Sequence, residues 1–399
     1  MAQKTSTSLR ILWHSCSPTG RGGYGIVTKY IACNLGDLFP IVVSCYYGMP
    51  QHTTVKLNGV PILPTSMADF GRFSVMHYMD KFQINLPILH TDFWPFPWFS
   101  KLPNSMVYGP IDNDDFNSID IKTMKDFSHF VPCSNFSKQV YEKITGKKVD
   151  DMIPHGVNTS VFKSYPKLQC RKEFKFSKKK FIFGMVGANS DHEPRKGWDD
   201  LFIALHTFAE EFPQEKQNWV AFCYTNPFDE KGYDLGAVAK YLGLGYNVYF
   251  PEHLPLMVGL EELQMAKLYN TFDLFLNASR REGFCLPILE AQACGVPVVC
   301  PDITAMPELV KGHGWISKKG DLVFTPRGWA SHKADREDLA KKIEDAYFNQ
   351  SQRKEFGIKA QQFAQQYNWE LLLNEKWIPL LERLNLLCSK GLNKISSSS

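Results

Sequence analysis

One order of elements, strand then loop then helix, starts near residue 9 and starts again near residue 181. The first strand is predicted over residues 9–14, and the restart is the apolar run at residues 180–187. Alternation of strands with helices favours a mostly parallel sheet covered by helices on both faces. At 399 residues the chain is also too long for one ordinary domain. The sequence therefore predicts two α/β domains of similar architecture.

Apolar periodicity and cap signals place the remaining elements. Ser134 precedes a periodic run and is expected to cap a helix over residues 136–145. A last amphipathic helix is predicted over residues 369–387. The other predicted strands cover residues 41–46, 74–77, 86–90, 105–108, 130–132, 219–224, 248–250, 274–277 and 298–300. The other predicted helices cover residues 27–38, 198–212, 260–269, 287–293 and 336–349.

The composition changes over residues 163–180, where eight Lys and Arg stand against one acidic residue. A solvated surface is the simpler interpretation of this run, and a phospholipid-headgroup patch is the alternative. We predict a first domain over residues 1–170 and a second over residues 171–365. Residues 366–399 are then expected to form a helix that returns to the first domain, followed by a disordered tail.

Charge and cysteine usage limit the classes of function. The excess of 45 Lys and Arg over 41 Asp and Glu is too small to predict a nucleic-acid partner. No run of 18 apolar residues and no signal peptide is present. The ten cysteines include no Cys-x-x-Cys pair, so reduced thiols in a cytoplasmic protein are expected, with attachment to a membrane surface as the alternative.

Two loops are candidates for binding an anion. Residues 19–25 read Thr-Gly-Arg-Gly-Gly-Tyr-Gly between a strand and a helix, and glycines let a ligand approach the free amides of a helix start. The loop also fits the dinucleotide fingerprint, but the expected acid about 20 residues later is replaced by Ser-Cys-Tyr at residues 44–46. In the second half, Arg195 and Lys196 precede a helix and could hold a diphosphate. The alternatives are a tight turn for the first loop and a solvated charged loop for the second.

A third segment carries two acids, Glu282 and Glu290, with Pro287 at an expected helix start between them. Glu282 could simply stabilise the start of that helix. Glu290 lies on an apolar helix, where an unpaired Glu is rare, so a ligand rich in hydroxyls is a reason for its presence. Eight helical residues rise roughly 12 Å, whereas the carboxylates of glycoside hydrolases lie roughly 5–9.5 Å apart. The two acids are therefore predicted to hold a ligand and not to act as a hydrolytic pair.

The pattern Glu-x7-Glu followed by Ala-x3-Gly-x-Pro-Val-Val resembles the retaining GT-B glycosyltransferases, specifically glycosyltransferase family 4 (glycosyl transferases group 1). Similar segments follow in the order of that family over residues 10–385. They are residues 21–25, 131–138, 153–158 with Phe162, 194–197 and 368–369. The resemblance implies an α/β GT-B fold, in which two Rossmann-like β/α/β domains face a cleft and the C-terminal helix returns to the N-terminal domain. The first domain would take the acceptor and the second the donor.

The resemblance also implies roles for individual residues. Glu282 would hold hydroxyls of the donor sugar, and Glu290 would accept hydrogen bonds from the ribose. Lys196 and Arg195 would balance the diphosphate, which Gly22 and Gly23 would approach from the other domain. The other implied donor contacts are Gly283, Phe284, Cys285 and Leu286 at the sugar and diphosphate, and Phe250, Pro251 and Glu252 at the base.

The sequence departs from the family at two places. Many relatives have an Arg directly after the glycine that ends the first strand of the second half, where this chain has Ala188, and Arg195 is expected to supply that charge. Many relatives also have a His near the donor sugar in the first half. Residues 107–112 read Val-Tyr-Gly-Pro-Ile-Asp instead, so His90 or Asp112 is expected to substitute, with a purely structural role as the alternative for His90.

The function implied by the resemblance is transfer of a sugar from a nucleoside-diphosphate sugar to a hydroxyl of a glycan, lipid or protein-linked acceptor, with retained configuration and without a metal or another cofactor. A sugar-nucleotide epimerase of the same fold is the nearest alternative, and a nicotinamide-dependent oxidoreductase is a weaker one. The Asp-Asn-Asp sequence at residues 112–114 suggests the metal motif of GT-A enzymes as a further alternative. The aromatic run at residues 93–99 is interpreted as a packed loop, or alternatively as a sugar or membrane contact.

Overall fold

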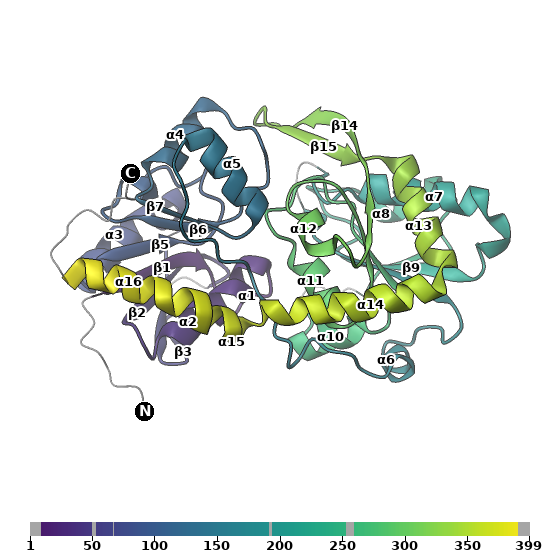
Figure 1. Ribbon diagram of the computed structural model, residues 1–399, viewed down its shortest axis with the longest axis horizontal. Helices are drawn as coiled ribbons and strands as arrows, with labels where there is room; N and C mark the ends of the chain where they lie inside the picture. Colours follow the sequence, from purple (N-terminus) through teal and green to yellow (C-terminus); the bar gives the residue numbers. More distant parts are fainter. Residues whose placement is uncertain (1–8, 50–52, 67, 191–193, 253–258, 390–399) are drawn as a thin grey trace. The chain divides into compact units, whose positions relative to one another are not determined.

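A computed structural model describes residues 9–49, 53–66, 68–190, 194–252 and 259–389. The chain divides into two compact units (Figure 1). The first contains residues 1–111, 116–156 and 369–399, and the second contains residues 112–115 and 157–368. The division after residue 156 differs from the predicted boundary at residue 170. It lies earlier because residues 157–170 pack in the second unit, where Val157 bridges to Asn368 and the Tyr165 amide donates to Asn270 Oδ1 at 2.8 Å.

The first unit is built on a seven-stranded sheet with the order β3-β4-β2-β1-β5-β6-β7. All neighbouring strands are parallel except β3 and β4 at one edge, which are antiparallel. The strands are β1 (Ile11–Cys16), β2 (Ile41–Tyr47), β3 (Val55–Leu57), β4 (Val60–Pro64), β5 (Leu86–Leu89), β6 (Met106–Gly109) and β7 (His129–Pro132). The central strand β1 is buried along nearly all of its length, as expected for a sheet covered on both faces.

The helices of the first unit follow its strands. They are α1 (Gly23–Tyr30), α2 (Ala32–Leu35), η1 (Ala68–Gly71), α3 (Arg72–Lys81), η2 (Phe99–Lys101), α4 (Ser118–Asp126) and α5 (Asn135–Thr145). Helix α1 begins at Gly23, four residues before the predicted start of the helix over residues 27–38. The predicted cap of α5 is confirmed, because the Ser134 side chain accepts a hydrogen bond from the Ser137 amide.

The predicted strand over residues 74–77 is wrong, because these residues lie within helix α3. Only Val75 of this helix is buried, whereas Phe73 and Met76 are exposed. A helix that buries so little gives no clear 3.6-residue period, and four residues with two apolar side chains fit a strand equally well.

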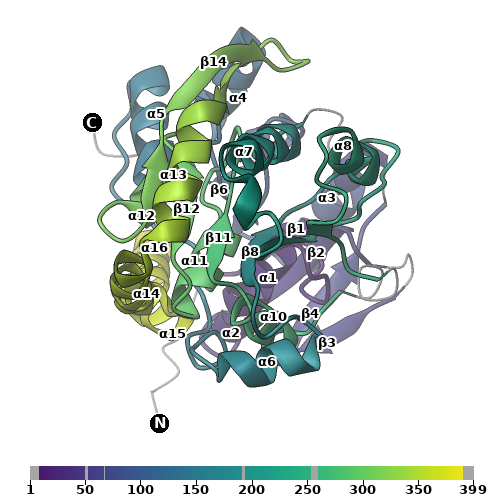
Figure 2. The ribbon, with the colours of Figure 1, turned by 90° about the vertical axis from the view of Figure 1, so that its right-hand side faces the viewer.

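The second unit contains a parallel six-stranded sheet with the order β10-β9-β8-β11-β12-β13 and a separate two-stranded sheet. The strands are β8 (Phe181–Val186), β9 (Trp219–Tyr224), β10 (Val248–Tyr249), β11 (Leu274–Leu276), β12 (Val298–Pro301) and β13 (Trp315–Ser317), with β14 (Lys319–Phe324) and β15 (Ala330–Ala334) in the smaller sheet. The helices are α6 (Lys167–Glu173), α7 (Trp198–Glu211), η3 (Pro213–Glu215), α8 (Leu235–Tyr241), α10 (Glu262–Tyr269), α11 (Leu286–Ala293), α12 (Met306–Val310), α13 (Arg336–Phe348), α14 (Gln350–Ala364) and η4 (Gln365–Tyr367). Helix α7 packs against α13 and α11 against α14, with strands β8 and β11 between these pairs (Figure 2).

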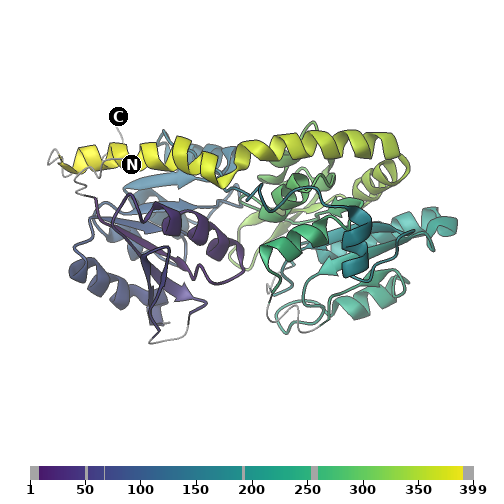
Figure 3. The same ribbon diagram turned by 90° about the horizontal axis from the view of Figure 1, so that it is seen from below.

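The C-terminal segment packs in the first unit, as predicted, and lies beside its strands (Figure 3). It consists of α15 (Trp369–Leu372), one π-helical turn (Leu373–Trp377) and α16 (Ile378–Ser389). The fully buried ring of Trp377 lies 5.6 Å from that of Trp13 and 4.8 Å from that of Tyr108. Near the end of α16, Asn385 accepts a hydrogen bond from the Leu9 amide at 3.0 Å.

Helix α16 extends two residues beyond the predicted end at residue 387. The rest of the predicted tail, residues 390–399, lies outside the described residues. Within the described ranges, no helix combines the length and the apolar character that crossing a membrane requires. All ten cysteines are free thiols, and eight of them are buried.

Buried histidines should make the stability of the first unit depend on pH. Burial lowers the pKa of His14 and of His90 to about 4, against about 6.5 in an unfolded chain. The unfolded state therefore binds more protons between these values, so this stability is complete above pH 6.5 and is lost as the pH falls towards 4. We expect the free energy of unfolding in urea to fall by about 2 kcal/mol for each of the two groups between pH 7.5 and 5. His90→Phe should reduce this loss, whereas substitution of the exposed His77 on α3 should not; an equal loss in all three proteins would contradict the assignment.

Candidate functional site

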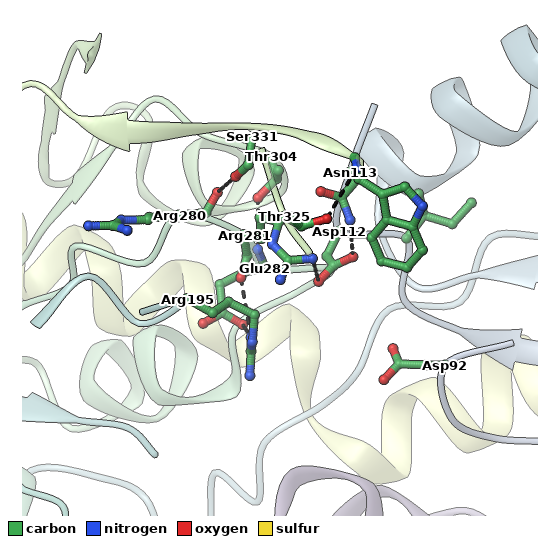
Figure 4. A network of polar contacts seen from close by, with 12 residues as sticks. Asp92, Asp112, Asn113, Arg195, Arg280, Arg281, Glu282, Thr304, Thr325 and Ser331 are labelled. Atoms are coloured by element: carbon green, nitrogen blue, oxygen red, sulfur yellow. Dashed lines mark hydrogen bonds and ion pairs between the residues drawn. The ribbon is translucent and has the colours of Figure 1, made fainter. Parts of the chain in front are cut away.

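Two loops at the carboxyl ends of neighbouring parallel strands bring Lys196 and Glu282 together. Lys196 lies in the loop between β8 and α7, and Glu282 lies in the loop between β11 and α11. Lys196 Nζ donates to Glu282 Oε1 at 2.5 Å. Arg195, which lies beside Glu282 in Figure 4, has its Nη1 3.7 Å from Glu282 Oε2. One carboxylate therefore faces two cations, Lys196 and Arg195. The structure thus brings together two side chains that are 86 residues apart in the sequence.

A glycine permits this close approach of the two loops. Gly197 has a φ of 63°, and a Cβ atom there would lie 1.9 Å from the carbonyl oxygen of Ala278. The Arg280 amide also donates to the Arg195 carbonyl at 2.7 Å, which closes the contact between the loops. Any side chain at residue 197 would separate Lys196 from Glu282.

Glu282 is buried and remains ionised. Its burial alone would raise the pKa of the carboxyl, but Lys196 and Arg195 outweigh burial and lower it. The backbone is also fixed, because the Glu282 amide donates to Thr304 Oγ1 at 3.0 Å. A buried carboxylate held in one orientation can accept hydrogen bonds from ligand hydroxyls.

A network of ion pairs around the buried Arg280 and Asp200 supports the same loop. Arg280 Nε donates to Asp200 Oδ2 at 2.8 Å, and its Nη2 donates to both carboxylate oxygens of Asp199 at 2.8 and 2.7 Å. Arg336 Nε donates to the other oxygen of Asp200 at 2.8 Å. Both acids lie in the first turn of α7, where they also favour the helix dipole. The network therefore fixes the start of α7, which follows Lys196, to the loop that carries Glu282.

Glu290 lies on α11, and one of its carboxylate oxygens is already bonded. Tyr269 Oη, at the end of α10, donates to Glu290 Oε2 at 2.8 Å. Burial raises the pKa of Glu290 to about 7, although the Tyr269 hydrogen bond opposes the shift. At neutral pH this carboxyl is therefore near its midpoint of titration, in contrast to Glu282. The remaining oxygen, Oε1, is the one that could accept from a ligand.

The turn between the two acids is buried and strained. Gly283, Phe284, Cys285 and Leu286, the other predicted contacts of this segment, are all buried. Cys285, the residue before the first turn of α11, has a φ of 84°, which costs a residue other than glycine about 1–3 kcal/mol. Strained residues of this kind cluster at active sites and ligand clamps, and Cys285 stands directly before α11, three residues after Glu282.

His90 and Asp112, the two residues expected to replace the histidine of the family, lie in different units. Asp112 belongs to the second unit, where its Oδ2 lies 3.6 Å from Arg281 Nη1, next to Glu282 (Figure 4). His90 belongs to the first unit and is fully buried, with Nδ1 2.9 Å from the Tyr108 carbonyl oxygen. The rings of Trp13, Tyr24, Tyr108 and His155 surround it. Only Asp112 of the two therefore lies in the network that contains Glu282.

In the glycine-rich loop, the backbone at the two predicted donor contacts is exposed to solvent. Gly22 and Gly23 are exposed, and a Cβ atom at Gly22 would meet nothing within 4 Å. Gly25 has a structural requirement instead, since a Cβ there would lie 2.6 Å from the Ser17 carbonyl oxygen. Gly22 and Gly23 remain predicted contacts.

The predicted base contacts follow the edge strand β10. Phe250 and Pro251 are partly buried, and Glu252 is exposed at the end of that described stretch. None of them belongs to the network around Glu282, and their role stays a prediction.

Sequence reasoning missed the residues that support the site. Arg280 and its partners Asp199 and Asp200 are not among the residues predicted from the sequence. The sequence does contain a signal for this network. Two consecutive Arg, at 280 and 281, precede Glu282 in a segment of mostly small and apolar residues. A cation that is buried in such a segment requires an acidic partner. Nothing in the sequence distinguished Tyr269 as the partner of Glu290.

Residues 167–363, which contain both loops and α11, match the model of a family described as glycosyl transferases group 1. These residues belong to that family. D-inositol 3-phosphate glycosyltransferase of Segniliparus rotundus is 30% identical over 161 residues, which are 40% of this chain and 33% of that protein. The chain thus spans a third of the length of this curated relative.

Solved structures are similar over nearly the whole chain. Sucrose-phosphate synthase from Thermosynechococcus elongatus has a TM-score of 0.76 and 14% identity, with 95% of this chain and 100% of that chain covered. HepE of Anabaena in complex with UDP-glucose has a TM-score of 0.71 and 17% identity, with 94% and 100% covered. This likeness confirms the predicted GT-B fold class.

The Arg280 network predicts a large loss of stability when one cation is removed. Arg280→Met leaves Asp200, which is fully buried, with Arg336 alone. Breaking a buried pair from one side costs about 3–5 kcal/mol, measured as the free energy of unfolding in urea. Lys359→Met, which breaks an exposed pair with Glu355, is the control and should cost less than about 1 kcal/mol. Equal small losses in both variants would refute a stabilising role for the network.

Proposed function

We propose that this chain is a retaining glycosyltransferase of family 4. It transfers a sugar from a nucleoside-diphosphate sugar to an acceptor hydroxyl on a glycan, a lipid or a protein-linked glycan. The observation that carries the proposal is the contact of Lys196 and Arg195 with Glu282 at the start of α11, eight residues before Glu290. The family match of residues 167–363 and the UDP-glucose complex of a protein with a similar fold support the same donor class.

The ion pair at Glu282 is proposed to open when the donor binds. The diphosphate would attract Lys196 and Arg195, and the freed oxygens of Glu282 would accept hydrogen bonds from sugar hydroxyls. The ribose hydroxyls would bond to Glu290 Oε1 while Tyr269 holds Oε2. Two cations and the amides at the start of α11 neutralise the diphosphate in the way a divalent metal does in other transferases, so no metal is required.

The proposed reaction depends on stabilisation of the negative charge that develops on the leaving diphosphate. The bond between the anomeric carbon and the diphosphate oxygen breaks, and Lys196, Arg195 and the α11 amides stabilise the charge that develops on that oxygen. The acceptor oxygen forms the new bond on the face that the diphosphate leaves, and its proton passes to the departing phosphate. No protein carboxylate forms a bond to the sugar, so the configuration is retained without a covalent intermediate.

The two acids should affect binding differently. Glu290→Ala should weaken the binding of the nucleoside diphosphate, and Glu282→Ala should mainly weaken the binding of the intact nucleotide sugar. A hydrogen bond to a charged group contributes roughly 1.5–3 kcal/mol, so each affected constant should change about tenfold or more. Calorimetry in buffer containing EDTA with UDP and UDP-glucose, followed by the other common nucleotide sugars, measures both constants. Equal UDP affinity in wild type and Glu290→Ala, or binding that needs an added divalent ion, would count against the site.

The stereochemistry of the product tests the reaction itself. With an α-linked donor, we expect proton NMR of the fresh product to show an α linkage. A β linkage, or a glycosylated protein detected by mass spectrometry, would overturn the mechanism. An epimerase would instead change the donor sugar without an added acceptor, and the same spectra would reveal that outcome.

A further inference from the structure

The hairpin of β14 and β15 leaves one apolar face exposed in the second unit. Its two strands form a sheet of their own, and the chain continues from it into α13 (Figure 2). Leu322 and Phe324, two residues apart on β14, are 52% and 67% exposed. Side chains two residues apart on a strand share one face, so these two form a continuous apolar strip.

The opposite face of the hairpin is fixed to the candidate site. Val323 pairs with Ser331, so the two side chains lie on the face away from Leu322 and Phe324. Ser331 is buried, and its Oγ donates to the Arg280 carbonyl oxygen at 3.1 Å (Figure 4). Phe324 therefore cannot turn inward without breaking this contact, and the apolar strip is presented outward by a fixed inner face.

The charges around the strip are mostly positive. Between residues 318 and 335 the hairpin and its base carry four cations, Lys318, Lys319, Arg327 and Lys333, and two acids, Asp321 and Asp335. The Asp335 amide donates to the Lys318 carbonyl oxygen at 3.0 Å. Lys318, Lys319 and Arg327 are exposed, and Arg327 stacks on Trp329 at 5.0 Å. Exposed Phe and Leu beside Lys and Arg is the chemistry that binds an anionic lipid surface, since the apolar side chains enter the headgroup region and the cations pair with phosphates.

The basic run at residues 163–180 fits such a surface less well. Lys167 and Arg171 of α6 both pair with Asp273, at 2.8 and 2.5 Å, so part of its charge is neutralised inside the unit. Its two phenylalanines, Phe174 and Phe176, are partly buried, and Phe176 packs on Phe222 at 4.8 Å. The run therefore supplies charge without the exposed aromatic side chain that the hairpin has.

We infer that the outer face of the β14–β15 hairpin is a docking surface for an anionic lipid membrane. Leu322 and Phe324 insert between headgroups, and Lys318, Lys319 and Arg327 bind the lipid phosphates. The inner face of the hairpin contacts the loop of Glu282, so docking would bring that site close to the membrane surface. The inference concerns binding to lipid and does not depend on the proposed sugar transfer.

Vesicle flotation of the full chain tests the inference. The protein should float with vesicles of phosphatidylcholine and phosphatidylglycerol but not with phosphatidylcholine alone. Lys318→Ala with Lys319→Ala should lower the partition coefficient roughly 25-fold, because each basic residue near an anionic leaflet contributes about fivefold. Leu322→Ser with Phe324→Ser should lower it about tenfold or more. The matched control is Tyr241→Ser with Tyr246→Ser, two tyrosines of the same unit that are 91% and 92% exposed, and it should bind as wild type does.

Three results would overturn the inference. The first is no binding of the wild-type protein to the anionic vesicles. The second is binding by both hairpin variants that equals the binding of the tyrosine control. The third is an oligomer of the wild-type protein that becomes a monomer in the Leu322→Ser/Phe324→Ser variant. The last would identify the face as a contact between copies of the chain. UDP binding measured on the same variants should be unchanged, so that loss of lipid binding is separate from any failure of the donor site.

Discussion

The carboxylate of Glu282 is the constraint on which the donor-side architecture depends. A buried charge is tolerated only where cations and hydrogen-bond donors compensate for lost water. Lys196 and Arg195 meet that need from the neighbouring loop, and the loops can meet because Gly197 has no side chain. The same interaction that allows the chain to bury this acid therefore assembles the group of charges that we propose binds a diphosphate.

The two acids of the Glu-x7-Glu pattern have opposite electrostatic environments. Nearby cations lower the pKa of Glu282, whereas burial raises the pKa of Glu290 to about 7. The lowered pKa keeps Glu282 ionised at neutral pH, so this carboxylate would need replacement partners if Lys196 paired with a ligand, as we propose. Glu290 binds or releases a proton near neutrality, so a ligand that donates hydrogen bonds to it also favours its ionised form. The two residues are thus suited to different parts of one ligand.

Short-range sequence patterns predict most of the helices and strands. They cannot predict which side chains from different elements contact one another, because those contacts depend on which strands are neighbours in the sheet. Periodicity predicts helix α7 and strand β8 correctly because both are heavily buried. It predicts a strand at residues 74–77 of α3 because Val75 is the one buried residue of that helix. Glu282 and Lys196 were found as motif residues, but their 2.5 Å contact depends on which strands are neighbours. Arg280 was missed for the same reason, since its importance comes from Asp199 and Asp200 on another element. Asp112 was proposed from its position in the first half, yet it contacts Arg281 of the second unit.

The first unit is closed by the helical segment that begins at Trp369, and the second unit includes residues 112–115, so neither unit is a single contiguous stretch of sequence. Exchange of residues 157–368, the larger part of the second unit, between relatives therefore needs crossovers near residues 156 and 369. A single crossover would join an N-terminal sheet to a C-terminal helix from another protein. The π-helical turn at Leu373–Trp377 makes that mismatch severe, since a regular α-helix there would rotate everything after it by roughly 100°. Leu380, Leu381 and Leu384, which are buried, would then face the wrong direction. Residues 369–389 should accordingly diverge together with the first strands, although more than 200 residues of the second unit separate them in the sequence.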